Sequence, residues 1–267
     1  MQGKPRPEGV KNDLSVAVIT LNEEKNLDRC LQSVKGLATE IVVIDSGSSD
    51  GTRETAEKYG AVFEFRKWTG HVDQKNHALR KCSCSWVLSL DADECLSDEL
   101  RAEIRRKLDS DAFDDYNGYY LNRCTYYLGK WIRHAWYPEW RLRLVKRELA
   151  RWEGTNPHDR LSVVGRTSRL KDGDFLHYSY RDLRHHFEVS LNYARIGAEA
   201  DIEKGRRFRP LKFFGSPLGR LFKFLFLKMA WRDGWRGWII TGSAVMTAFM
   251  KQCYLLENFL ARRSENN

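Results

Sequence analysis

The chain has 267 residues, of which 42% are hydrophobic and 12% aromatic, and it carries a formal net charge of +9. This composition excludes an intrinsically disordered chain, and the length suits one large domain or one domain with an appendage. Six scattered cysteines without a Cys-x-x-Cys pair argue against a zinc site and indicate reduced thiols in a cytosolic protein.

In chain order, a polar segment of twelve residues comes first, and we expect no secretory signal in it. Apolar runs then predict four strands, at Leu14–Thr20, Glu40–Asp45, Ala61–Phe65 and Trp86–Leu90. Segments of helical periodicity separate these runs, the last of them being His71–Lys81. Strands that alternate with helices are typical of a parallel, doubly wound α/β sheet. The sequence contains neither Gly-x-Gly-x-x-Gly after the first strand nor a P-loop, which argues against both of those nucleotide folds.

Carboxylates follow two of the predicted strands. Asp45 ends the second strand, and Asp91 and Asp93 follow the fourth. Ligands of open α/β sheets bind beyond the carboxyl ends of strands, so these side chains are expected to share one crevice. Their oxygens suit Mg²⁺ or Mn²⁺, ions that usually accompany a phosphate. Taken alone, the Asp-x-Asp pair is equally compatible with solvated loop carboxylates or with caps of the helix predicted at Ser97–Leu108.

Four motifs in this region occur in a fixed order. They are Ile19-Thr20-Leu21-Asn22-Glu23-Glu24, Val43-Ile44-Asp45-Ser46-Gly47-Ser48-Ser49-Asp50-Gly51-Thr52, Gln74-Lys75-Asn76 and Leu90-Asp91-Ala92-Asp93-Glu94. Together they resemble the signature of family 2 inverting glycosyltransferases, and the type that the chain is most similar to is the lipopolysaccharide-core heptose β-1,4-glucosyltransferase. The resemblance spans residues 14–180. It implies an α/β fold of the GT-A class, with a Rossmann-like, mostly parallel sheet, and the composition of the chain beyond this fold predicts a C-terminal amphipathic helical region.

The resemblance also implies roles for individual residues of a nucleotide-sugar pocket. Thr20, Asn22 and Glu23 should line the pocket, although Asn22 and Glu23 also suit the cap of the helix that follows. Asp45 should accept a hydrogen bond from the uracil imide, and Lys75 should approach the ribose or the phosphates.

The same resemblance divides the Asp-x-Asp pair. Asp91 should meet the ribose or a metal-bound water, while Asp93 should bind the Mg²⁺ or Mn²⁺ that bridges the diphosphate. His177 is the candidate for a late metal or diphosphate contact, with a structural histidine as the alternative. Glu94 is expected to support the following turn.

Beyond residue 110 the α/β alternation stops, and two further strands are predicted near residues 117–121 and 140–145. Arg141 and Arg143 share one face of the second of these strands. They are expected either to contact the diphosphate or an acidic acceptor, or to form a solvated face.

The stretch from Trp152 to Leu161 is where related sequences carry Gly-x-x-His-Glu. An inverting transferase needs a general base for the acceptor hydroxyl, and this chain has His158-Asp159 at that place. We predict Asp159 as the base, with His158 or Glu153 as the next candidates.

The net positive charge belongs to the C-terminal part of the chain. Residues 1–204 hold 33 basic and 33 acidic side chains, whereas residues 205–263 hold 12 basic and 2 acidic ones. Phenylalanine, leucine and tryptophan alternate with these basic residues, a composition typical of helices that lie at a membrane interface. The longest uncharged run, from Gly237 to Met250, has 14 residues, fewer than the ~20 that a spanning helix needs.

These observations predict a catalytic domain at residues 12–204 and a helical membrane-association region at residues 205–263. One alternative for the basic region is a solvated helical pair. A nucleic-acid-binding surface is the less favoured alternative, because no RNA- or DNA-binding motif occurs.

The resemblance implies transfer of glucose from a UDP-sugar to a lipid-linked saccharide, the inner-core heptose of lipopolysaccharide. The enzyme would act peripherally on an anionic membrane surface, at the cytoplasmic face of the inner membrane. Other acceptors, namely a polyprenyl phosphate or an exopolysaccharide, and a non-catalytic nucleotide-sugar-binding protein are the alternatives.

Overall fold

The computed structural model describes residues 13–110, 113, 115–154 and 159–264. The chain divides into two compact units. Unit 1 runs to Cys124 and also includes Glu139–Tyr178, whereas unit 2 comprises Thr125–Pro138 and the chain from Ser179 onward. The predicted boundary between residues 204 and 205 therefore falls inside unit 2.

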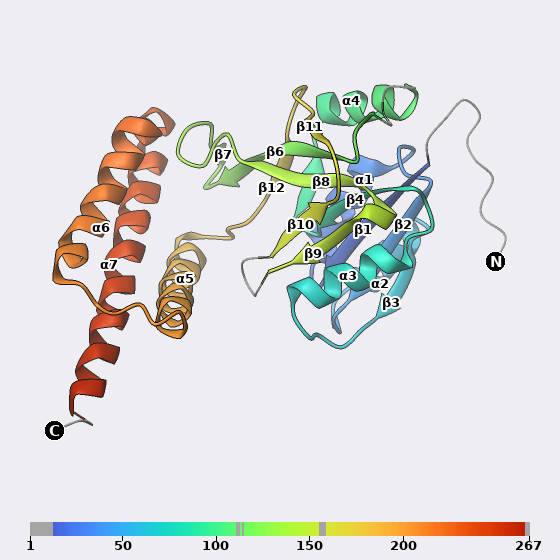
Figure 1. Ribbon diagram of the computed structural model, residues 1–267. Helices are drawn as coiled ribbons and strands as arrows, with labels where there is room; N and C mark the ends of the chain where they lie inside the picture. Colours follow the sequence, from blue (N-terminus) through green and yellow to red (C-terminus); the bar gives the residue numbers. More distant parts are fainter. Residues whose placement is uncertain (1–12, 111–112, 114, 155–158, 265–267) are drawn as a thin grey trace. The chain divides into compact units, whose positions relative to one another are not determined.

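Unit 1 is built on four parallel strands, in the order β3-β2-β1-β4 (Figure 1). The strands are β1 (Leu14–Thr20), β2 (Glu40–Asp45), β3 (Val62–Phe65) and β4 (Trp86–Asp91). The helices that connect and follow them are α1 (Glu24–Val34), α2 (Thr52–Lys58), α3 (His71–Lys81) and α4 (Asp98–Leu108). The predicted alternation of strands and helices is confirmed.

The apolar runs form strands because both faces of the parallel sheet are covered. Val16 and Val18 of β1 point into one core, which also contains residues of α1 and α4. Ala17, between them in sequence, points to the opposite face and packs with Ala78 and Leu79 of α3.

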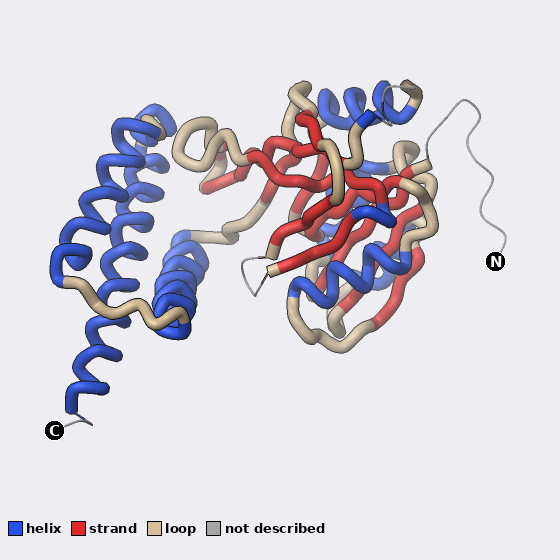
Figure 2. Tube along the Cα trace, viewed as in Figure 1, coloured by secondary structure: helices blue, strands red, loops and turns tan. Residues whose placement is uncertain are grey.

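Further strands, most of them antiparallel to their neighbours, extend this sheet beyond β4. Figure 2 colours the strands red. Strand β8 (Trp140–Lys146) pairs antiparallel with both β4 and β6 (Gly118–Tyr127), and β11 (Thr167–Arg169) pairs parallel with β6. Strand β5 (Glu94–Leu96) pairs antiparallel with β12 (Phe175–His177), which sets His177 opposite Glu94.

A separate hairpin follows β8 and the 3-10 turn at Arg147–Leu149. It consists of β9 (Ala150–Glu153) and β10 (Arg160–Val163), with Trp152 opposite Leu161. Both of these side chains are buried and pack with Leu142 and Val145 of β8. The hairpin is thereby anchored to the sheet, and Asp159 immediately precedes β10.

Unit 2 is mainly helical. It contains α5 (Leu183–Glu203), α6 (Pro210–Phe222), a π-helical turn (Lys223–Leu227), a 3-10 turn (Ala230–Asp233), α7 (Trp235–Ser264) and the short β7 (Lys130–Trp131). Helix α7 packs against α5 and α6, and a 2.8 Å hydrogen bond joins the hydroxyls of Ser190 and Ser243.

One buried carboxylate ties the loop after β7 to the helical part of unit 2. Asp233 is 2% exposed and accepts hydrogen bonds from the backbone N–H groups of Arg133, His134 and Ala135. These bonds lower the pKa of Asp233, although burial opposes its ionisation. The loop therefore belongs to unit 2 through contacts that span about a hundred residues of sequence.

Helix α7 contains the uncharged run from Gly237 to Met250 and extends over 30 residues. Among the described helices it is a candidate membrane span by length and composition, a criterion that core helices of soluble proteins also meet. In the apolar window of this helix, 28% of the residues are buried within the protein.

Candidate active site

The carboxyl ends of β1, β2 and β4 bring the first group of predicted site residues to one edge of the sheet. Thr20 is in register with Asp45, and Ile19 is in register with Asp91. Asp45 is 3% exposed, and its Oδ2 accepts hydrogen bonds from two backbone N–H groups of the following turn, each at 2.8 Å. The Thr20 hydroxyl is buried without a hydrogen-bond partner among the described residues, so it has a bond to offer a ligand.

Asn22 and Glu23 join the loop after β1 to the turn after β2. Asn22 has a left-handed backbone (φ 54°), and its Oδ1 accepts a 2.8 Å hydrogen bond from the Ser49 backbone N–H. Glu23 occupies the N-cap position of α1 without a side-chain capping bond, and its carboxylate accepts from Asn26 Nδ2 at 2.7 Å. Neither residue therefore caps α1 with its side chain, and Asn22 fastens the loop after β1 to the turn after β2.

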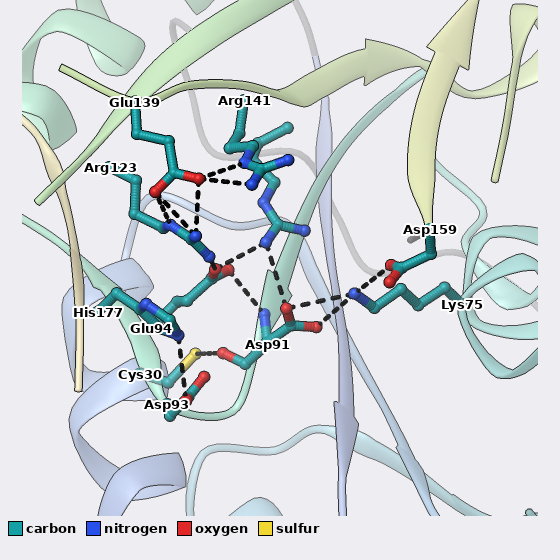
Figure 3. Close-up of polar contacts among 11 residues, drawn as sticks. Cys30, Lys75, Asp91, Asp93, Glu94, Arg123, Glu139, Arg141, Asp159 and His177 are labelled. Atoms are coloured by element: carbon teal, nitrogen blue, oxygen red, sulfur yellow. Dashed lines mark hydrogen bonds and ion pairs between the residues drawn. The ribbon is translucent and has the colours of Figure 1, made fainter. Parts of the chain in front are cut away.

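Lys75 bridges two of the predicted carboxylates (Figure 3). Its Nζ lies 2.9 Å from Asp91 Oδ1 and 2.9 Å from Asp159 Oδ2, and its side chain is 6% exposed. The β9–β10 hairpin thus brings Asp159 to the end of β4, 68 residues away in sequence from Asp91. The predicted general base and the first carboxylate of the Asp-x-Asp pair share one cation.

A second basic side chain holds Asp91 from the other side. Arg143 Nη2 donates to Asp91 Oδ2 at 3.2 Å and to Glu94 Oε1 at 2.6 Å, and Glu94 is fully buried. Glu94 Oε2 also accepts a 3.0 Å hydrogen bond from the Asp91 backbone N–H, so it supports the turn after β4.

Burial and charge act against each other in this cluster. Burial disfavours the charged form of Asp91, but Lys75 and Arg143 outweigh it and hold the pKa of Asp91 well below its ordinary value. Burial raises the pKa of Glu94, an effect that Arg143 opposes and Asp91 reinforces. Burial also disfavours the cation of Arg143, yet Glu94 and Asp91 raise its pKa, so Arg143 stays charged.

Arg141 and Arg143 have different surroundings, and the regular alternation expected from the sequence is interrupted between them. The register with β6 shifts at Arg143, so the leucines on either side of it pack in different core clusters. Arg141 is 48% exposed and pairs with Glu139, which also pairs with Arg123 at 2.8 Å (Figure 3). The sequence interpretation missed both Arg123 and Glu139. Arg123 lies two residues after one predicted strand and Glu139 lies one residue before the next, so the sequence showed no sign of their pairing, which depends on how β6 and β8 are aligned.

Comparison with known proteins decides the family. Residues 15–163, more than half of the chain, match the profile of Glycosyl transferase family 2. The chain belongs to glycosyl transferase family 2. Its sequence is 28% identical to the lipopolysaccharide core biosynthesis glycosyltransferase LpsC of Rhizobium meliloti, over 96% of each chain. A glycosyltransferase of Rickettsia typhi is also 28% identical, over 94% of this chain and 89% of its own length.

The fold of this family 2 glycosyltransferase also has a counterpart among solved structures. The mannosyltransferase PcManGT from Pyrobaculum calidifontis, in complex with GDP-Man and Mn²⁺, is 15% identical and aligns with a TM-score of 0.54, over 93% of this chain and 91% of that protein. The predicted GT-A fold and the predicted glycosyltransferase class are confirmed.

The metal ion expected by analogy has a two-residue candidate site in this glycosyltransferase. Asp93 Oδ2 and His177 Nε2 lie 3.3 Å apart, and both side chains are partly exposed. No cluster of three or more His, Cys, Asp or Glu suited to a metal occurs in the part of the chain that the structure describes. Ions of the Mg²⁺ type at nucleotides use one or two carboxylates and take the rest from phosphates and water, so Asp93 is the side chain of this pair that suits such an ion, with His177 beside it.

The other two candidates for the general base are placed differently. Glu153 lies on β9 and pairs with Arg151 at 2.6 Å and with Arg160 at 3.3 Å. Hydrogen bonds from Arg151 and Ser162 lower the pKa of Glu153 to about 2. His158 lies outside the described residues. Among the described candidates, Asp159 is the one that joins the cluster of Lys75 and Asp91.

Proposed function

We propose that this glycosyltransferase is an inverting enzyme that transfers glucose from a UDP-sugar to a saccharide acceptor. The observation that carries the proposal is the convergence of Asp91 and Asp159 on Lys75 at the carboxyl end of β4, two residues before Asp93. This arrangement brings Asp159, the candidate base, next to the carboxyl ends of the strands, which is where ligands bind in open α/β sheets.

In the proposed reaction, Asp159 accepts the proton of an acceptor hydroxyl at a carboxylate oxygen. The hydroxyl oxygen forms a bond to the anomeric carbon as the bond from that carbon to the diphosphate breaks, so UDP leaves from the opposite face and the configuration inverts. A Mg²⁺ or Mn²⁺ ion held by Asp93 and His177 would supply positive charge to the leaving diphosphate.

The remaining predicted residues form the donor pocket in this proposal. Thr20, with its unpaired buried hydroxyl, and Asn22 border the nucleotide, and Asp45 meets the uracil from the end of β2. Asp91 faces the ribose or a bound water. Arg141 is exposed beside this cluster and suits a phosphate or an acidic group of the acceptor.

The acceptor is proposed to be the inner-core heptose of a lipopolysaccharide, by analogy with LpsC, whose name places that relative in lipopolysaccharide core biosynthesis. A lipid-linked acceptor requires the enzyme to work at a membrane. We propose peripheral binding to the anionic cytoplasmic face of the inner membrane.

Helix α6 supports the membrane proposal because none of its residues is buried. Leu211, Phe214 and Leu218 share one helical face and are 90%, 70% and 63% exposed. Lys212 and Arg220 are exposed on the other side of the same helix. Apolar groups at the depth of the acyl chains with basic groups among the headgroups are the arrangement of interfacial helices.

The membrane proposal predicts co-sedimentation of the protein with vesicles that contain an anionic phospholipid, at moderate salt. Replacing Phe214 and Leu218 by Ser should lower the bound fraction at least severalfold, because two large apolar groups no longer enter the bilayer. Val164→Ser, an equally exposed apolar site of unit 1 at 72% exposure, is the control and should bind as the wild type does. Equal binding of all three proteins, or none by the wild type, would contradict the proposal.

The donor proposal predicts metal-dependent stabilisation by UDP-sugars. In thermal unfolding with and without Mn²⁺, UDP-glucose at a hundred times its Kd should add about 2.7 kcal/mol to stability. Asp93→Asn should remove most of the metal-dependent part, because one of two protein ligands is lost. Asp50→Asn, in the turn after β2, is the control, and stabilisation by GDP-sugars alone would contradict the choice of donor.

A further inference from the structure

Lys75 on α3 lies between two carboxylates from distant parts of unit 1. Its Nζ is 2.9 Å from a carboxylate oxygen of Asp91 and 2.9 Å from one of Asp159, and 4.4 Å from the centre of the Trp152 ring. The ammonium group is therefore enclosed by two anions and one aromatic face, each of which stabilises a cation. With so little exposure, this lysine is committed to partners within the protein.

The neighbours of Lys75 in sequence fasten the same parts of the structure. Asn76 exchanges two hydrogen bonds with the backbone of Trp152 on β9, both at 2.9 Å. Gln74 Nε2 donates to Ser46 Oγ, in the turn after β2, at 3.2 Å. The segment Gln74-Lys75-Asn76 thus connects α3 with the β9–β10 hairpin on one side and with the donor-side turn on the other.

The β9–β10 hairpin needs such a connection because it carries the proposed base. Asp159 precedes the first residue of β10, so the ladder of the hairpin does not hold it. A side chain that takes part in chemistry is effective only when a supporting group fixes its position. Among the described residues, the ion pair with Lys75 is the contact that connects Asp159 to the end of β4 (Figure 3).

We infer that Lys75 is the positioning residue of the general base: it holds the Asp159 carboxylate over the donor site by bridging it to Asp91. This inference rests on the proposed function. It differs from the expectation that Lys75 contacts the ribose or the phosphates, because a bridge acts on the rate of transfer and a nucleotide contact acts on nucleotide affinity.

The test is a double-mutant cycle with Lys75→Met, Asp159→Asn and the combined variant, in which kcat, KM for the donor and the Kd of UDP are measured. Lys75→Met should lower kcat about a hundredfold, because the base is misplaced, and should change the Kd of UDP less than threefold. The combined variant should be no slower than Asp159→Asn alone, since there is then no base left to position. Lys81→Met, at the exposed end of the same helix, is the control.

A second readout needs no substrate. Lys75→Met should lower the Tm of the wild type by several degrees, and by a smaller amount in the Asp159→Asn background, because the ion pair with Asp159 is already lost there and only the pair with Asp91 remains to be removed. Rate losses that multiply, or a Kd of UDP that rises in step with the fall in kcat, would overturn the positioning role alone. A wild-type protein without transfer activity towards any UDP-sugar would overturn the proposed function and the positioning role together.

Discussion

Asp159→Asn is expected to lower the rate of sugar transfer by about a hundredfold to ten-thousandfold, the range that a positioned general base contributes. The amide keeps the size of the side chain but cannot accept the proton of the acceptor hydroxyl. UDP affinity should change little, because Asp159 comes from the β9–β10 hairpin and not from the strand ends that we propose as the donor pocket. Initial rates of UDP release with acceptor, and UDP binding by calorimetry, measure the two quantities.

Glu153→Gln is the matched control for this prediction. It makes the same chemical change on the same hairpin, at a carboxylate that pairs with Arg151 and Arg160 on the surface. Its rate should stay within a few-fold of the wild type. Wild-type turnover by Asp159→Asn would remove Asp159 from the mechanism and leave His158 and Glu153 as candidates.

Arg143→Met is expected to reduce the free energy of unfolding by about 3–5 kcal/mol, the usual cost of removing one partner of a buried ion pair. The reason is that Glu94, which is fully buried, loses the 2.6 Å contact with the Arg143 guanidinium. Denaturant unfolding followed by fluorescence measures the change. Arg141→Met, two residues away on β8 but 48% exposed, should cost no more than about 1 kcal/mol.

The double variant Arg143→Met/Glu94→Gln separates this explanation from a loss of packing. Removing the charge of Glu94 should recover part of the lost stability, because the buried carboxylate is then no longer unpaired. If Arg143→Met and Arg141→Met lowered the free energy of unfolding equally, the buried ion pair would contribute no more to stability than a surface ion pair does.

The fold of the first hundred residues was predictable because its signals are local. Apolar runs of four to seven residues with polar turns at their ends define β1 to β4, and the helices between them carry buried residues at helical spacing, as Leu27, Leu31 and Val34 do in α1. The carboxyl ends of parallel strands meet at one edge, so the proximity of Thr20, Asp45 and Asp91 also followed from the pattern.

The contacts that define the site were not predictable, because they depend on pairing over long separations. The Lys75–Asp159 ion pair spans 84 residues and requires the β9–β10 hairpin to pack on α3. The alternation of Arg141 and Arg143 predicted a shared face, but the register with β6 shifts at Arg143, and this side chain is buried in ion pairs with Glu94 and Asp91. The composition of the chain likewise showed that a basic region begins at residue 205. It gave no sign that the loop after β7 belongs to unit 2, because that depends on hydrogen bonds to Asp233, about a hundred residues away.

In the proposed reaction, this site transfers a sugar with inversion and Asp159 serves as its base. The anomeric configuration of the product, determined by NMR when the protein acts on UDP-glucose with a heptose-containing lipopolysaccharide core acceptor and Mn²⁺, tests both parts at once. We expect a β-linked product from the α-linked donor, formed by the wild type and lost in Asp159→Asn. An α-linked product, or β-linked product formed equally well by Asp159→Asn, would contradict the proposed reaction.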